Sequence, residues 1–68
     1  LLLMPTGTIK FYNRRKGFGF IRFDESEKEI FVHATGLLDK RSIMENDKVS
    51  FEEKESEKGM TAVNVKKV

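Results

Sequence analysis

The sequence predicts an all-β fold, a small five-stranded antiparallel barrel. Five short segments rich in β-branched and aromatic residues follow one another along the 68 residues. Turn residues separate these segments at intervals of about 8 to 12 residues, a spacing typical of barrels and sandwiches. No window shows helical periodicity. In so short a chain, a five-stranded barrel closes most sheet edges around one core, and the OB-fold has this form.

Each strand has its own signal in the sequence. TIKFYN, FGFIRF and KEIFVH are separated by a polar turn before Gly17 and by the acidic turn DESE. A longer connection over residues 34–46 follows, in which TGLL is expected to form one helical turn. KVSFEEK and MTAVNVKKV then flank the turn ESEKG. The strands are expected at residues 8–13, 18–23, 28–33, 48–54 and 60–68.

Length and composition restrict the class of protein. A domain of this size buries only about 60% of the surface that its unfolded chain exposes. The sequence has no cysteine and one histidine, so neither a disulfide nor a transition-metal site is expected, and no cofactor is required. No apolar run approaches the roughly 20 residues that cross a bilayer. We therefore expect a cytoplasmic monomer without a membrane segment.

The domain boundaries follow from the first residues. LLLM is too short for a signal peptide and lacks a basic flank. One domain is predicted over residues 5–68, with residues 1–4 as an N-terminal extension outside the fold. Met4 is interpreted as the natural start. The alternative is that Leu1 to Leu3 pack on the first strand.

Charge is distributed unevenly along the chain. Residues 1–23 carry five cations and no acid, whereas residues 24–68 carry eight cations and all eleven acids. Such asymmetry favours an electropositive face that meets an anion, and the alternative is an unevenly charged, solvated surface. The clustered cations are Lys10, Arg14, Arg15, Lys16 and Arg22.

Alternation along the strands predicts where the phenylalanines point. In the second strand Gly19, Ile21 and Phe23 share one face, and Phe18, Phe20 and Arg22 share the other. An aliphatic core is complete without the outer phenylalanines, and it is predicted from Ile9, Ile21, Ile30, Val32, Val49, Val63 and Val65, with Phe51 also inward. The alternative places Phe18, Phe20 and Phe31 inside, but it exposes Ile30 and Val32.

Outward phenylalanines beside Lys10, Lys16 and Arg22 suit nucleobases. Stacking of a base on an aromatic side chain contributes about 1–3 kcal/mol, and cations neutralise phosphates. Bases in a duplex are already stacked, so the predicted partner is single-stranded RNA or DNA. The same aromatic face could instead be a protein-interaction surface. An enzyme is not expected, because no nucleophile or carboxylate pair accompanies His33.

At this point the residues resemble a known family. KGFGFI followed by IFVH is similar to the two ribonucleoprotein motifs of the bacterial-type cold-shock domain, and GTIKFYN, DKVSFE and TAVNVKKV resemble its other strands. The resemblance implies an OB-fold barrel that binds single-stranded RNA and DNA with low sequence specificity, as a nucleic-acid chaperone. The binding residues that it implies are Lys10, Phe11, Lys16, Phe18, Phe20, Phe31, His33 and Lys58.

Several positions depart from the family pattern. Phe11 stands where the family usually has tryptophan, and strict alternation would place it on the side of Ile9, so a bend or bulge in the first strand is required. Ala34 replaces a frequent phenylalanine, and LLDKRSIMEN lacks an aromatic residue. The predicted platform is therefore smaller at one end, where Lys40 and Arg41 could contact phosphates instead.

Overall fold

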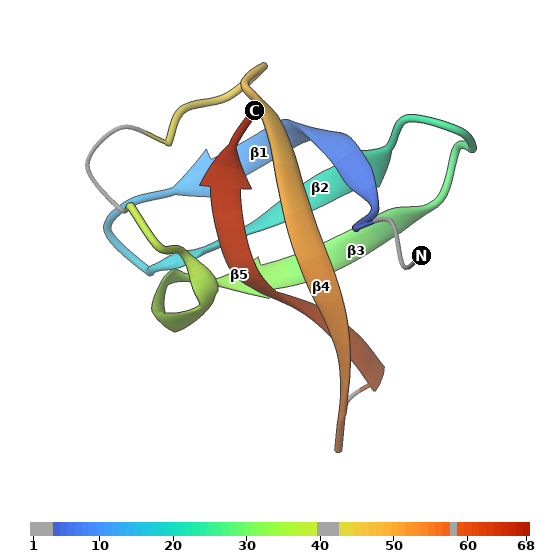
Figure 1. Cartoon of the computed structure of the whole chain (residues 1–68). Helices are drawn as coiled ribbons and strands as arrows, with labels where there is room; N and C mark the ends of the chain where they lie inside the picture. The colour runs from blue at the N-terminus through green and yellow to red at the C-terminus, as the bar shows by residue number, and fades with distance from the viewer. Residues whose placement is uncertain (1–3, 40–42, 58) are drawn as a thin grey trace.

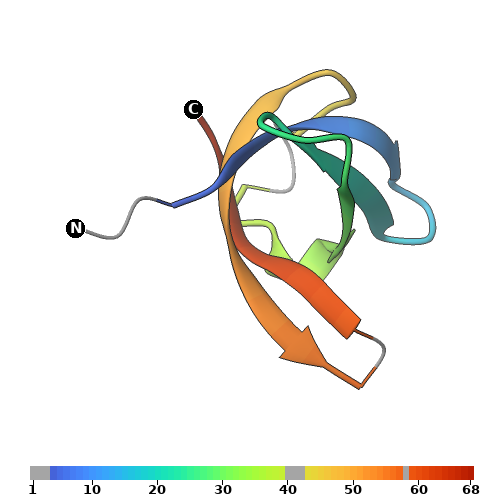
Figure 2. The same ribbon diagram turned by 90° about the vertical axis from the view of Figure 1, so that its right-hand side faces the viewer.

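Five strands of the computed structural model form one closed barrel (Figures 1 and 2). The structure describes residues 4–39, 43–57 and 59–68. A short 3-10 turn, η1 (Ala34–Gly36), follows the third strand at the expected helical turn. Every strand end lies within two residues of its predicted position, so the predicted fold class is confirmed. The strands are β1 (Thr6–Asn13), β2 (Phe18–Phe23), β3 (Glu29–His33), β4 (Lys48–Ser56) and β5 (Gly59–Lys67).

The strands pair in the order β1-β2-β3-β5-β4, and β4 returns to β1 to close the barrel. The pairings of β1 with β2 and β4, of β2 with β3, and of β4 with β5 are antiparallel. The pairing of β3 with β5 is parallel and joins Phe31 to Thr61 and Val32 to Ala62. A ring of five strands cannot alternate in direction throughout, so one parallel pair is a topological necessity.

The barrel interior is aliphatic apart from Phe51. Phe51 is completely buried, and its ring meets the partly buried Phe23 at 5.4 Å between centroids. The inward positions predicted for β1 to β4 are therefore confirmed. The buried hydrophobic residues are Ile9, Ile21, Ile30, Val32, Leu37, Ile43, Val49, Phe51, Ala62 and Val65.

The prediction for β5 was wrong at one position. Val63 was expected inside, but it is only partly buried, and Ala62 occupies the core instead. The pairing of β4 with β5 shifts register between Ser50 and Glu52, and Asn64 in this stretch has a positive φ of 53°. The extra residue of this bulge interrupts the alternation, so Ala62 and Val65 both point inward.

The prediction for the bulge in β1, by contrast, was correct. The register of β1 on β2 shifts between Ile9 and Phe11, where a bulge or bend was predicted. Ile9 is therefore buried, while Lys10 and Phe11 are both exposed and Tyr12 packs against the core. Two consecutive outward residues bring an aromatic ring to the outer surface beside β2.

Gly19 allows the first two strands to approach closely. A Cβ atom at this position would clash with the carbonyl oxygen of Phe11 and would lie 2.9 Å from the Cα of Tyr12. Both atoms belong to the backbone of β1 and cannot swing aside. Glycine is therefore required between Phe18 and Phe20, because the backbone of β1 comes too close to β2 for a side chain at this position.

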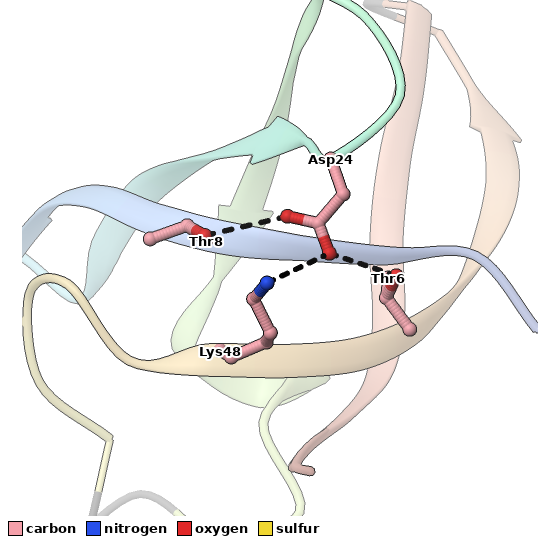
Figure 3. A network of polar contacts seen from close by, with 4 residues as sticks. All are labelled: Thr6, Thr8, Asp24 and Lys48. Atoms are coloured by element: carbon pink, nitrogen blue, oxygen red, sulfur yellow. Dashed lines mark hydrogen bonds and ion pairs between the residues drawn. The ribbon is translucent and has the colours of Figure 1, made fainter.

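Polar contacts of Asp24 tie three strands together at the end of β2 (Figure 3). The Asp24 carboxylate accepts hydrogen bonds from the hydroxyls of Thr6 (2.9 Å) and Thr8 (3.4 Å) on β1. It also forms a salt bridge of 3.5 Å with Lys48 on β4. The sequence predicted only an acidic turn here, but the carboxylate links the end of β2 to both β1 and β4.

The connection before β4 also contributes to the core. Leu37 and Ile43 are buried, although the sequence did not identify either as core. Leu37 bridges to Val65 of β5, and the Leu38 N–H donates to the Val65 carbonyl at 2.8 Å. Arg14, one of the clustered cations of the sequence, donates from Nη2 to the Ile43 carbonyl at 3.2 Å. This contact holds the end of the connection against the β1–β2 turn.

Candidate functional site

The outer surface of β1, β2 and β3 carries a continuous aromatic cluster. In the register of the barrel, Phe20 lies opposite Phe11 on one side and Phe31 on the other. Phe18 lies opposite His33 in the next row along the strands. We call Phe11, Phe18, Phe20, Phe31 and His33 the aromatic platform. The structure brings together all five aromatic residues that the sequence predicted as site residues.

Phe18 lies at the centre of the cluster. Its ring centroid is 5.9 Å from that of Phe31 in a stacked arrangement, and 5.8 Å from that of Phe11 in a tilted one. Phe20 meets both Phe18 and Phe31 edge-on, at 6.4 and 5.8 Å. These separations are typical of favourable aromatic pairs. The rings therefore hold one another in place without any ligand.

Exposure differs within the platform. Phe11 and Phe20 are 40% and 36% exposed, whereas Phe18 and Phe31 are half-buried between them. All four rings lie outside the barrel, because the inner side of the same strands is filled by Ile9, Ile21 and Val32. The alternative in which the phenylalanines fill the core is thus excluded. What remains is an apolar surface of ring faces and edges that a planar ligand could contact.

His33 borders the platform where β3 ends and η1 begins. Its Nδ1 atom accepts a hydrogen bond of 3.2 Å from the backbone N–H of Thr35 and lies 3.0 Å from the Thr35 hydroxyl. The side chain therefore caps the N-terminus of η1 while its ring stays exposed. Sequence reasoning did not identify Thr35, because a threonine two residues after a histidine carries no distinctive signal.

The β1–β2 turn carries Lys16, which is exposed and lies two residues before Phe18. Its backbone N–H donates to the side-chain oxygen of Asn13 at 3.0 Å, and the Gly17 N–H donates to the Asn13 carbonyl at 2.8 Å. Gly17 has a positive φ of 73°, which glycine adopts without steric cost. Its carbonyl accepts from the Ala34 N–H at 2.8 Å, so the turn is fixed to the end of β3.

Three exposed cations accompany the aromatic rings: Lys10 in the β1 bulge, Lys16 in the turn and Arg22 on β2. The salt bridges among the described residues join Lys48 to Asp24 and Lys67 to Asp47. None of the three cations takes part in them. Within the described residues, no salt bridge neutralises their positive charge.

Three further basic residues considered from the sequence lie outside the described residues: Lys58, a predicted binding residue, and Lys40 and Arg41. Over the residues that the structure does describe, no group of three or more His, Asp or Glu side chains could hold a metal ion. Within the same ranges, no helix is long and apolar enough to cross a membrane.

Comparison with known families places this geometry in context. Residues 5–68 match the family described as "'Cold-shock' DNA-binding domain". The chain belongs to this family. The resemblance seen in the sequence is thereby confirmed, and nucleic-acid binding is the function that membership of the cold-shock family supports.

Relatives in bacteria agree with this membership. The chain is similar to the major cold shock protein of Micrococcus luteus, with 37% identity over 96% of this chain and 100% of the relative. It is also similar to the probable cold shock protein A of Mycolicibacterium smegmatis, with 42% identity over the same shares. Among solved structures, the Drosophila Unr structure CSD456 matches 97% of this cold-shock chain with a TM-score of 0.80 and 34% identity. This chain spans 27% of that longer one.

Proposed function

We propose that this cold-shock domain binds single-stranded RNA and DNA by stacking bases on the aromatic platform, with low sequence specificity. The observation that carries the proposal is the outward cluster of Phe11, Phe18, Phe20 and Phe31 on three adjacent strands. Lys10 and Lys16 are exposed and lie close to Phe11 and Phe18 along the chain. Neither forms a salt bridge with an acidic side chain among the described residues.

The proposed division of labour follows from the chemistry of each group. Every nucleobase has a π-face, so stacking on phenylalanine tolerates any sequence. Lys10 and Lys16 neutralise phosphates and release counterions, which makes the affinity fall with salt. We assign Lys58 the same role from the family resemblance alone. A duplex keeps its bases stacked on one another and cannot use the platform.

A chaperone role follows by mass action. A protein that binds open strands and not hairpins shifts the equilibrium of RNA toward open forms by an amount that depends on its concentration. This role uses binding energy alone, so we propose a non-enzymatic, monomeric protein that acts in the cytoplasm without cofactor or metal. The domain that performs it is proposed to be residues 5–68.

The test is fluorescence anisotropy with short labelled single strands at two salt concentrations, using the wild type and Phe20→Ala. We expect the wild type to bind single strands in preference to a duplex of matching sequence. Phe20→Ala should lose about 1–3 kcal/mol of binding free energy, the typical contribution of one stacked base. Val68→Ala, which trims an apolar side chain that is 78% exposed at the other end of the chain, serves as the control.

The result has two clear readings. Equal binding to duplex, or a Phe20→Ala affinity equal to that of the wild type, would contradict the stacking model. Absence of any binding to nucleic acid would leave the aromatic platform as a protein-interaction surface, which is the competing explanation for exposed phenylalanines.

A further inference from the structure

The contacts of His33 also determine which of its two ring nitrogens carries the proton. The backbone N–H of Thr35 can only donate a hydrogen bond, so the Nδ1 atom of His33, 3.2 Å away, must accept it. An imidazole nitrogen that accepts carries no proton. In the neutral ring the proton is then on Nε2, and the Thr35 hydroxyl oxygen, 3.0 Å from Nδ1, lies where its proton can share the same acceptor atom.

The second nitrogen of the ring stays open. Among the described residues, no hydrogen bond reaches the Nε2 atom of His33, and the side chain is exposed at the edge of the platform. His33 lies directly opposite Phe18, the central ring of the platform, in the register of β2 on β3. A donor at this atom would meet the edge of a base stacked on the neighbouring rings.

We infer that Thr35 is a positioning residue that holds His33 in its Nε2–H form, so that His33 offers a hydrogen-bond donor to an acceptor atom of a bound strand. This inference rests on the proposed function. It adds a polar contact to a surface otherwise composed of phenylalanine rings. Because Thr35 contributes both its backbone and its hydroxyl, the ring is oriented before the strand arrives, which lowers the entropy cost of binding.

The first arm of the test examines the free protein. Two-bond proton–nitrogen NMR spectra of the neutral ring report which nitrogen carries the proton. In the wild type we expect the Nε2–H form. Thr35→Val removes the hydroxyl and should raise the population of the Nδ1–H form, whereas Thr35→Ser should restore the wild-type spectrum. Thr61→Val, which removes a hydroxyl from the neighbouring strand β5, should leave it unchanged.

The second arm measures binding of a short labelled single strand. Thr35→Val should weaken binding roughly two- to tenfold, the range expected for one hydrogen bond, and Thr35→Ser should bind as the wild type does. His33→Phe keeps a ring on the platform but has no donor. In the His33→Phe background, Thr35→Val should cause no further loss if it acts through His33.

The outcomes separate the inference from the proposed function. If the wild type binds, but Thr35→Val changes neither the tautomer nor the affinity, the inference is overturned and the stacking model stands. An equal loss in both backgrounds overturns it too, because Thr35 would then act independently of His33. If the wild type binds no single strand, the proposed function fails, and the role of the donor fails with it.

Discussion

The two faces of β2 and β3 contrast within the same short strands. The inner face carries Ile21, Ile30 and Val32, all buried, while the outer face carries Phe18, Phe20 and Phe31 in partial contact with solvent. Aliphatic side chains fill the narrow barrel and define its core, whereas the aromatic rings outside it pack against one another. The contrast teaches that residue type alone does not locate the core: six phenylalanines occur in the chain, and Phe51 is the completely buried one among them.

Truncating one phenylalanine inside the barrel and one outside it gives the sharpest test of this contrast. Phe51→Ala should destabilise the fold by about 3–5 kcal/mol, because a large buried side chain leaves a cavity. That loss is a large share of the stability of a small domain. Urea unfolding followed by circular dichroism measures it.

Phe20→Ala is the matched control for that experiment. Its ring is 36% exposed, so we expect the unfolding free energy to fall by less than about 1 kcal/mol. Similar losses in the two variants would show that the outer rings are part of the core and would break the contrast.

Adding one methyl group at Gly19 tests why a glycine separates the two outer phenylalanines. The new Cβ would meet backbone atoms of Phe11 and Tyr12, so Gly19→Ala should cost about 1–3 kcal/mol of stability through overpacking. Thermal unfolding measures the loss. An unchanged midpoint would mean that β1 can move away from β2, and the platform would then tolerate a wider spacing.

The link at the end of β2 should contribute less than the core. Asp24→Asn keeps an oxygen acceptor for Thr6 or Thr8 but removes the charge that faces Lys48, so we expect a loss of about 1 kcal/mol. Urea unfolding at low and high salt checks the cause. A loss that persists undiminished in high salt would point to the hydrogen bonds alone, since the charge contribution is screened.

The smallest expected effect concerns the cations on the outer face. Lys10→Gln and Lys16→Gln should each reduce the slope of log affinity against log salt by about 0.7, the value for one phosphate contact on a single strand. Lys66→Gln, an exposed cation near the end of β5, is the control and should leave the slope unchanged. If all three variants keep the slope of the wild type, Lys10 and Lys16 do not contact phosphates of the bound strand.

Much of the fold and of the aromatic platform was predictable because the signals are local. Alternation along β2 and β3 follows from the geometry of a single strand, and the aliphatic core that the five strands complete together places Phe18, Phe20 and Phe31 outside. The bulge near Lys10 was predicted with the family resemblance, which implies that Phe11 faces outward, so Ile9 and Phe11 cannot both fulfil their roles in a regular strand.

The bulge in β5 shows where local reasoning stops. Nothing in MTAVNVKKV identifies Asn64 as a residue of positive φ, and the shift that buries Ala62 in place of Val63 depends on pairing with β4. The burial of Ile43 likewise depends on where the connection returns to the barrel, which the contact of Arg14 with its carbonyl helps to fix.

By itself the sequence determined the strands, the inward and outward faces of β1 to β4, the charge asymmetry and the family. Those properties depend on the order and alternation of neighbouring residues. The tertiary structure alone decided the register of β5, the links made by Asp24 and Arg14, and the orientation of His33 by Thr35. These features depend on distances and angles between atoms, most of them far apart in the chain, which alternation along a strand does not encode.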